Sequence, residues 1–175
     1  FRDLMYTPTL VEVQPELSLA TYRELRVPVL DQGREGACTG FGLATVVNYL
    51  LRTRDRAPEN ASVSPHLLYH LARRYDEWPG EGYEGSSARG AMKGWHRHGV
   101  CRESLWKTFA MPGVPDDVRN DWWADAMRRP LGAYYRVDTQ AISDMHVALN
   151  EVGVLYASAA CHAGWEEGYD VDMPT

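Results

Sequence analysis

The stretch that decides the fold runs from residue 31 to residue 41 and reads DQGREGACTGF. It leads directly into an apolar pattern with helical spacing. The pattern consists of Leu43, Val46, Val47, Leu50 and Leu51. It predicts a helix from about Cys38 to Arg54, so Cys38 lies in the first turn. Unpaired backbone N–H groups and the helix dipole favour an anion there, which makes Cys38 a candidate nucleophilic thiolate.

The residues before Cys38 suit the chemistry of a thiolate that attacks an amide carbonyl. The attack creates an oxyanion, which fixed hydrogen-bond donors must stabilise. The candidate donors are the backbone N–H of Cys38 and the side-chain amide of Gln32. Gly33 and Gly36 allow the loop between them to pass close to a substrate. The alternative interpretation is a small buried cysteine that caps a core helix, which is the more common place for a lone cysteine.

This segment resembles the active-site segment of papain-like cysteine peptidases, which reads Gln-Gly-x-x-Gly-Ser/Ala-Cys-x-x-Phe and opens a long buried helix. The matching residues are Gln32, Gly33, Gly36, Ala37, Cys38 and Phe41. Two residues depart from the pattern. Glu35 stands where secreted members usually carry a disulfide-forming cysteine, and Thr39 replaces the usual aromatic residue. We interpret the match as a resemblance to a bacterial-type branch of the C1 papain family.

The resemblance implies an α+β, papain-like fold. Its helical left lobe would be nearly complete, and its β-barrel right lobe would be only partly present. Residues 1–30 would form an extended N-terminal arm that belongs to the barrel lobe. Residues 31–130 would form the helical lobe with the nucleophile helix, and residues 131–175 would begin the barrel lobe.

Helical spacing and capping residues predict the remaining elements. The expected helices begin at Ser64-Pro65, run from Ser87 to Gly99, and cover 115–129 and 139–152, the last capped by Thr139. The expected strands cover 133–137 and 154–160. Met127 and Ile142 are expected to face the interior.

Residues 78–87 contain too many glycines for regular structure. The resemblance implies that Gly85 and Ser86 hold an extended substrate through backbone hydrogen bonds, and Gly36 is a further candidate substrate-binding residue. The family usually has two glycines in this segment, so Ser86 is a departure. The alternative is a plain surface turn before the next helix.

A thiolate peptidase also needs a histidine that transfers protons and an Asn or Asp that orients it. In the family both follow the nucleophile by about 130 to 150 residues. No histidine occurs between Gly168 and Thr175, and no Asn follows the nearest earlier candidate, His162. We therefore expect a C-terminal remainder or a second chain to supply both residues. The other interpretations are a catalytically incomplete homologue that acts as a binding module, and a papain-like amidase or acyl transferase.

Composition limits the partners. The net charge of −6 over 175 residues argues against nucleic acid and acidic membranes, and the resemblance implies a peptide or protein substrate. We expect Arg128-Arg129 on a solvated helix face. The sequence shows neither a membrane-spanning stretch nor a signal-peptide pattern. Its cysteines allow at most one disulfide besides a free Cys38, between Cys101 and Cys161, which favours the cytoplasm or another reducing compartment, or else a fold that is stable without disulfides. No metal or cofactor is expected.

Overall fold

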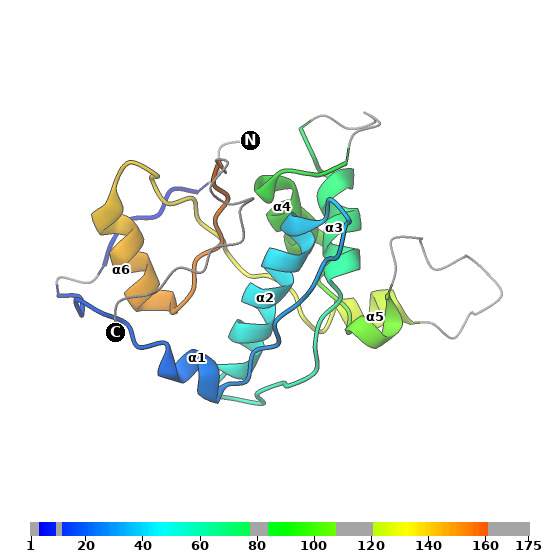
Figure 1. Ribbon diagram of the computed structural model, residues 1–175, viewed down its shortest axis with the longest axis horizontal. Helices are drawn as coiled ribbons and strands as arrows, with labels where there is room; N and C mark the ends of the chain where they lie inside the picture. The colour runs from blue at the N-terminus through cyan, green and yellow to red at the C-terminus, as the bar shows by residue number, and fades with distance from the viewer. Residues whose placement is uncertain (1–3, 10–11, 78–83, 108–120, 161–175) are drawn as a thin grey trace.

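The computed structural model describes residues 4–9, 12–77, 84–107 and 121–160 (Figure 1). Its helices are α1 (Ala20–Glu24), α2 (Cys38–Arg52), α3 (Pro65–Arg74), α4 (Ala88–His98), the 3-10 turn η1 (Glu103–Leu105), α5 (Trp122–Ala126) and α6 (Ile142–Val152). Within these ranges, β structure is confined to two isolated bridges, between Met5 and Arg136 and between Val63 and Arg102.

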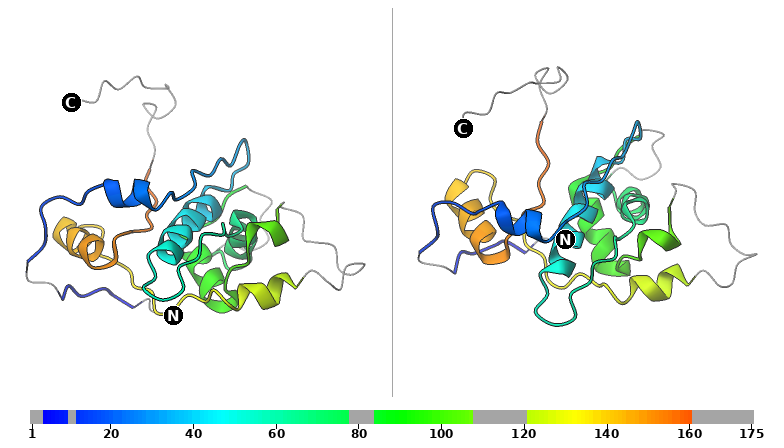
Figure 2. Two further views of the ribbon diagram at one scale, coloured as in Figure 1. Left: turned by 90° about the horizontal axis from the view of Figure 1, so that it is seen from below. Right: turned by 60° about the horizontal axis from the view of Figure 1, so that its bottom comes forward.

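Helices α2, α3 and α4 pack side by side and form the core (Figures 1 and 2). Their main apolar cluster contains Leu43, Ala44, Val47, Leu51, Val63, Leu68, Ala72, Ala91, Trp95 and Val100. Gly40 of α2 lies against the backbone of α3, where an added Cβ would be 2.6 Å from the Cβ of Tyr69 and would collide with the Pro65 carbonyl oxygen. Glycine at position 40 therefore places the first turn of α2 directly beside the first turn of α3.

The predicted caps of α3 and α4 are confirmed. The Ser64 hydroxyl accepts a hydrogen bond from the Leu67 N–H (3.0 Å) and donates one to the Trp106 carbonyl (2.6 Å). The Ser87 hydroxyl accepts one from the Gly90 N–H (3.0 Å). Each side chain satisfies a backbone donor that the helix itself leaves unpaired. Ser64 also attaches the start of α3 to the segment that follows α4.

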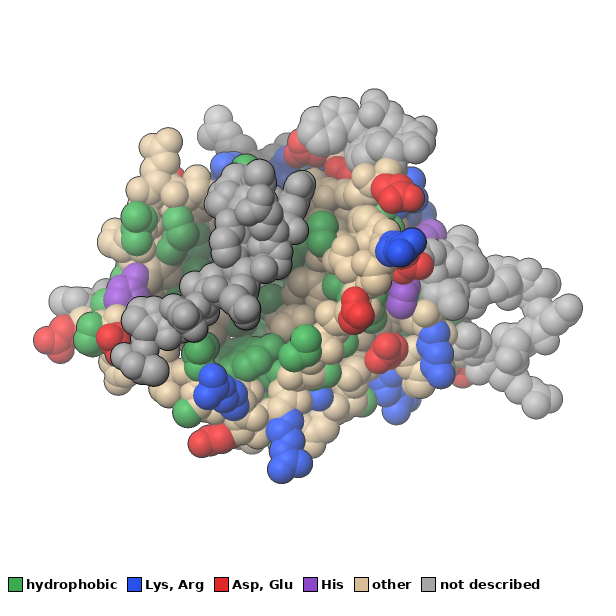
Figure 3. Space-filling view, in the orientation of Figure 1, with side chains coloured by type: hydrophobic (Ala, Val, Ile, Leu, Met, Phe, Trp, Pro, Cys, Tyr) green, Lys and Arg blue, Asp and Glu red, His purple; other side chains and the backbone are tan. Residues whose placement is uncertain are grey.

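Helix α6 and the N-terminal arm form the other side of the molecule, at the left of Figure 1. The Tyr6 hydroxyl donates to the Glu151 carboxylate (2.7 Å), and the Gln14 N–H donates to the Asn150 side chain (3.1 Å). On the face drawn in Figure 3, hydrophobic side chains gather in the middle, between α6 and the three-helix core. The arm is therefore attached to α6 by polar contacts with residues late in the chain.

Residues after α6 run back along α2 in the opposite direction. An added Cβ at Gly153 would collide with the Tyr49 hydroxyl near the end of α2, and an added Cβ at Gly42 would be 3.5 Å from the Tyr156 ring. The two contacts pair Gly153 and Tyr156, three residues apart, with Tyr49 and Gly42, which are seven residues or about 10 Å apart along α2. This path carries Tyr156 toward the start of α2.

The expected strands over 133–137 and 154–160 are wrong for the described residues. Arg136 accepts a hydrogen bond from the Tyr6 N–H (2.9 Å) and donates one to the Leu4 carbonyl (2.8 Å), and this single bridge is the β pairing of its segment. Alternating or apolar residues suit a strand, but a strand forms only where a neighbour offers a row of partners. The described part of the chain offers neither segment such a row.

Two predicted helices are shorter than expected. The helix over 115–129 is confined to α5 within the described residues, since 108–120 lie outside them; Met127 follows its end and is 70% exposed. Helix α6 begins at Ile142, which is 79% exposed, and not at a Thr139 cap. The Asp138 side chain accepts the Gln140 N–H (3.0 Å), so a turn occupies the residues before α6.

The expectation that Arg128-Arg129 lie on a solvated helix face is wrong for Arg129. It is 4% exposed, and its guanidinium binds the carboxylates of Glu59 and Asp125, the latter at 2.8 Å. The Trp95 indole donates to the Arg129 carbonyl (3.0 Å). A buried cation needs such paired partners. Arg129 therefore belongs to the interior and connects α5 with α4 and with the loop after α2.

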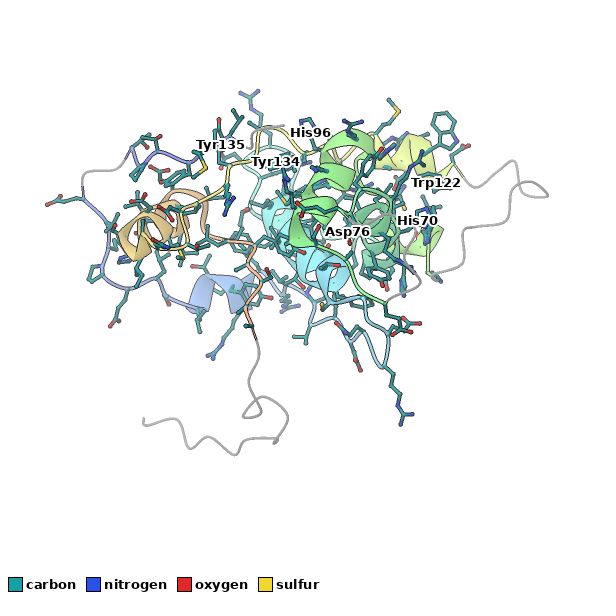
Figure 4. All side chains as sticks on the ribbon, turned by 90° about the horizontal axis from the view of Figure 1, so that it is seen from above. His70, Asp76, His96, Trp122, Tyr134 and Tyr135 are labelled. Atoms are coloured by element: carbon teal, nitrogen blue, oxygen red, sulfur yellow. The ribbon has the colours of Figure 1, made fainter. Side chains whose placement is uncertain are left out.

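Aromatic contacts attach the flanking segments to the core. Figure 4 shows Tyr134 beside His96 of α4, with ring centroids 5.6 Å apart, and His70 of α3 on the side of Trp122. Trp106 contacts His70 (5.4 Å) and meets Trp122 edge to face (5.0 Å). Such pairs stabilise beyond the area they bury. Trp122 thus anchors α5 against α3.

Candidate active site

Cys38 is the first residue of α2, and its side chain is exposed. The residue before the helix, Ala37, makes no side-chain cap, so nothing from that position covers the helix start. This placement is incompatible with the alternative of a cysteine buried in the core. Cys101 shows the contrast, because burial and then the Asp125 charge raise the pKa of its thiol to about 12. Cys38 is thus the cysteine with the features of a reactive thiol among the two described.

The loop before Cys38 folds back toward the helix start. The Gln32 side-chain amide donates to the Glu35 carbonyl (2.8 Å), which also accepts the Ala37 N–H (2.7 Å). The Asp31 carboxylate accepts the Gly33 N–H (2.8 Å), and Gly33 has φ +62°, a conformation that suits glycine. The amide of Gln32 is therefore held on the carbonyl that also binds the residue directly before the nucleophile.

Gly36 brings this loop against the predicted substrate-binding segment. An added Cβ at Gly36 would lie 3.0 Å from the Cβ of Glu84 and 3.5 Å from the Gly85 nitrogen. A side chain there would force the two backbones apart. In the structure the close neighbour of Gly36 is residues 84–86, whereas the close approach of Gly36 to a substrate stays a prediction.

Residues 84–86 are attached to both neighbouring helices. The Gly85 N–H donates to the Tyr69 hydroxyl of α3 (2.9 Å). The Ser86 and Thr39 hydroxyl oxygens are 2.6 Å apart and share a hydrogen bond. The structure therefore brings Gly36, Gly85 and Ser86 together beside the start of α2, around Cys38.

Tyr156 is a site residue that sequence reasoning missed. Its hydroxyl donates to the Thr39 carbonyl (2.8 Å), one residue after Cys38. Burial raises the pKa of Tyr156 well above its ordinary value, and the negative charge of Cys38 raises it further. The phenol therefore keeps its proton and remains a donor. The sequence feature that could have indicated its role is that Tyr156 is the one aromatic residue among the small and aliphatic residues of 154–160.

His66 is the described histidine attached to the active-site loop. Its Nε2 lies 3.8 Å from the Glu35 carboxylate, and its ring meets Phe41 edge to face at 5.4 Å. These contacts connect the first turn of α3 to the loop. The sequence candidate for the catalytic histidine, His162, lies outside the described residues.

Neither a metal centre nor a membrane span is found in the ranges that the structure describes. No group of three or more His, Cys, Asp or Glu side chains there could hold a metal ion. No helix in those ranges is both long enough and apolar enough to cross a membrane.

The helical bundle with an exposed cysteine at the start of α2 matches the helical left lobe of a papain-like fold. The structure is similar to the crystal structure of xylellain, a cysteine protease from Xylella fastidiosa, with a TM-score of 0.65 and 26% sequence identity. The match covers 85% of this chain and 59% of that chain, so the chain spans about three fifths of the length of that protease. No family model and no curated protein matches the sequence.

Proposed function

We propose that the chain is part of a papain-like cysteine endopeptidase, of a bacterial-type branch of the C1 family, that cleaves peptide bonds through a thioester on Cys38. The observation that carries this proposal is an exposed thiol at the first residue of α2. The Gln32 loop and residues 84–86 meet beside it, with Gly36 against Glu84. The likeness to a cysteine protease adds support.

The reaction begins with attack of the Cys38 thiolate on the carbonyl carbon of the scissile bond. The oxyanion forms beside the Cys38 N–H and the Gln32 amide, which are the proposed donors. An amide nitrogen carries two N–H bonds. One of those on Gln32 is held by the Glu35 carbonyl, which orients the other. The amine leaves with a proton, and water then hydrolyses the thioester and frees Cys38.

The substrate lies extended along residues 84–86. The backbones of Gly36, Gly85 and Ser86 offer hydrogen bonds that any peptide can accept or donate. The Gly85 N–H is already donated to the Tyr69 hydroxyl (2.9 Å), which orients this segment and leaves the Gly85 carbonyl for the substrate. The proposal therefore includes a peptide or protein partner, and neither nucleic acid nor a membrane surface.

The proton-transferring histidine and its orienting Asn come, in this proposal, from a C-terminal remainder or a second chain. In the same proposal residues 1–30 and 131–175 belong to the barrel lobe and 31–130 to the helical lobe. Contacts of the arm with Glu151 and Asn150 of α6 are consistent with one unit formed by the two ends of the chain.

The test uses the chain together with its natural continuation or second chain, which is called the intact protein below, and compares it with Cys38→Ala on an unfolded protein substrate. We expect Cys38→Ala to abolish cleavage and Cys101→Ala, which removes the buried thiol, to retain it. Iodoacetamide should modify Cys38 and stop cleavage at the same rate. Equal cleavage by the parent and Cys38→Ala would refute the proposal. Peptide binding without cleavage by the parent would favour the binding module, and transfer of an acyl group to an added amine would favour the acyl transferase.

A further inference from the structure

Two of the three departures from the papain-like pattern, Thr39 and Ser86, touch each other. Thr39 stands where the family usually has an aromatic residue, and Ser86 stands where it usually has a second glycine. These positions are 47 residues apart in the chain, and their hydroxyl oxygens are 2.6 Å apart. A glycine at position 86 has no hydroxyl to offer. The bond therefore exists because both positions depart from the pattern.

We infer that Thr39 is a positioning residue that fixes residues 84–86 against the nucleophile helix through Ser86, while Tyr156 holds Thr39 by its backbone carbonyl. The inference rests on the proposed function, since it assigns how the substrate-binding segment of that site is held. It makes Thr39 a structural link and leaves attack on the substrate to Cys38.

Thr39 is well placed to hold a neighbour. It is 8% exposed, and a buried hydroxyl needs a hydrogen-bond partner. A threonine within a helix has two main χ1 rotamers, and the bond to Ser86 is made in one of them. Ser86 therefore meets a partner on α2 whose hydroxyl has few alternative directions.

The bond also determines what Ser86 can offer a substrate. Its hydroxyl is occupied by Thr39, so its side chain points to α2. What remains for a bound peptide is the Gly85 carbonyl and the backbone of Ser86, because the Gly85 N–H is bound to Tyr69. Ser86 in this site therefore keeps the role that glycine has in the family, with its side chain used to anchor the segment.

Tyr156 attaches a third segment to the same residue. Its hydroxyl donates to the Thr39 carbonyl (2.8 Å), and a carbonyl oxygen can accept this bond in addition to its helical one. The Tyr156 ring lies 3.5 Å from the place of a Cβ on Gly42, one turn further along α2. Segments 84–86 and 154–160 are thus both hydrogen-bonded to Thr39, the residue that follows Cys38.

This arrangement predicts that substitutions of Thr39 or Ser86 weaken peptide binding without changing the reactivity of the Cys38 thiol. A peptide held on residues 84–86 must place its carbonyl within a few tenths of an ångström of the right distance from the Cys38 sulfur. Loss of the Thr39–Ser86 bond loosens the segment and leaves the thiol itself in place. Extended peptides should therefore bind less well, whereas a small alkylating agent should react as before.

The experiment measures kcat and KM on an extended peptide for the intact protein and its variants. Thr39→Ala and Ser86→Ala should each lower kcat/KM about five-fold, mainly through KM, which is the size of one neutral hydrogen bond. The double variant should lose no more than either single variant, because one bond is removed in all three. Thr39→Ser should stay within about two-fold of the parent. The matched control is Thr45→Ala on the same helix, whose hydroxyl donates to the Phe41 carbonyl of its own helix (3.1 Å).

Two further measurements separate this inference from the proposed function. Alkylation of Cys38 by iodoacetamide should proceed at the parent rate in Thr39→Ala and Ser86→Ala; slowed alkylation would show that Thr39 acts on the thiol and would overturn the assignment. If the parent cleaves no peptide, the proposed function fails, and a double-mutant cycle in urea unfolding still tests the link. A coupling of about five-fold in the unfolding equilibrium constant supports it, whereas independent effects of the two substitutions overturn it.

Discussion

Removal of the charge of Asp125 should destabilise the protein more than removal of any surface carboxylate of the described residues. The Asp125 carboxylate accepts hydrogen bonds from the Arg102 N–H (2.8 Å), from the Arg102 guanidinium (3.0 and 3.2 Å) and from the Arg129 guanidinium (2.8 Å). Asp125→Asn keeps the size of the side chain. It replaces one acceptor oxygen by an NH2 group that faces guanidinium donors, and it leaves Arg129 with Glu59 as its carboxylate partner.

The expected loss of unfolding free energy in Asp125→Asn follows from the burial of its partners, Arg102 and Arg129. Breaking a buried ion pair costs about 3–5 kcal/mol. The side chain of Arg102 is 45% exposed and regains water, and Arg129 keeps Glu59, so we expect the lower end, about 3 kcal/mol. With an m-value of about 2 kcal/mol/M, the urea midpoint should fall by about 1.5 M.

The effect should also depend on pH. Burial alone would raise the pKa of Asp125, but the Arg102 backbone N–H and the guanidinium groups of Arg102 and Arg129 lower it overall. A carboxyl whose pKa is lower in the folded state stabilises fully above its unfolded pKa, about 3.9, and loses this contribution as the pH falls through the folded value. The difference between the parent and Asp125→Asn should therefore be constant near neutral pH and shrink below about pH 4.

Urea unfolding followed by tryptophan fluorescence measures both the shift of the midpoint and its dependence on pH. The matched control is Glu77→Gln, which removes one partner of the exposed Glu77–Arg89 pair (3.1 Å) and should cost less than about 1 kcal/mol. A midpoint shift in Asp125→Asn no larger than that of Glu77→Gln would refute the reasoning, as would a difference from the parent that is independent of pH down to pH 2.

Other substitutions test the helix contacts and the site. Gly40→Ala should destabilise by about 1–3 kcal/mol, because its Cβ would meet α3 backbone; an unchanged Tm would show that α2 and α3 can separate at no cost. Ser64→Ala loses the cap of α3 and the bond to Trp106 and should lower the unfolding free energy by about 1–2 kcal/mol, measured against parent in urea. Tyr156→Phe should lower peptidase kcat/KM about five-fold, whereas Tyr75→Phe, which loses a bond to His98 away from the site, should not.

The helices were predictable because their signals are local. Ser64 and Ser87 cap helices within three residues of their own positions, and Gly99 and Gly153 end helices with φ +71° and +82°. The strands were not predictable, because pairing depends on residues far away in the sequence. Arg136 pairs with a residue about 130 positions earlier, and nothing near it in the chain signals that the pairing stops there.

The site residues also divide into those whose contacts are local in the sequence, which were predictable, and those whose contacts are distant, which were not. Cys38, Gln32 and Gly36 lie in one contiguous stretch, so their juxtaposition follows from a loop that enters a helix. Tyr156 reaches Thr39 across 117 residues, and a lone tyrosine in an apolar segment looks like any packing residue. Arg129 was misplaced for the same reason, since its partner Glu59 lies 70 residues earlier.

Thr39 and Ser86 show how a contact changes the meaning of a pattern. Taken one at a time in the sequence, each is a mismatch that weakens the resemblance to papain-like peptidases. Residues in contact do not contribute independently, so two mismatches that bond to each other carry less weight against the resemblance than two unrelated ones. A sequence in this family with an aromatic residue at the first position should then carry glycine at the second, and one with a hydroxyl at the first should carry a hydroxyl at the second. An alignment in which the two positions vary without regard to each other would contradict the link between α2 and residues 84–86.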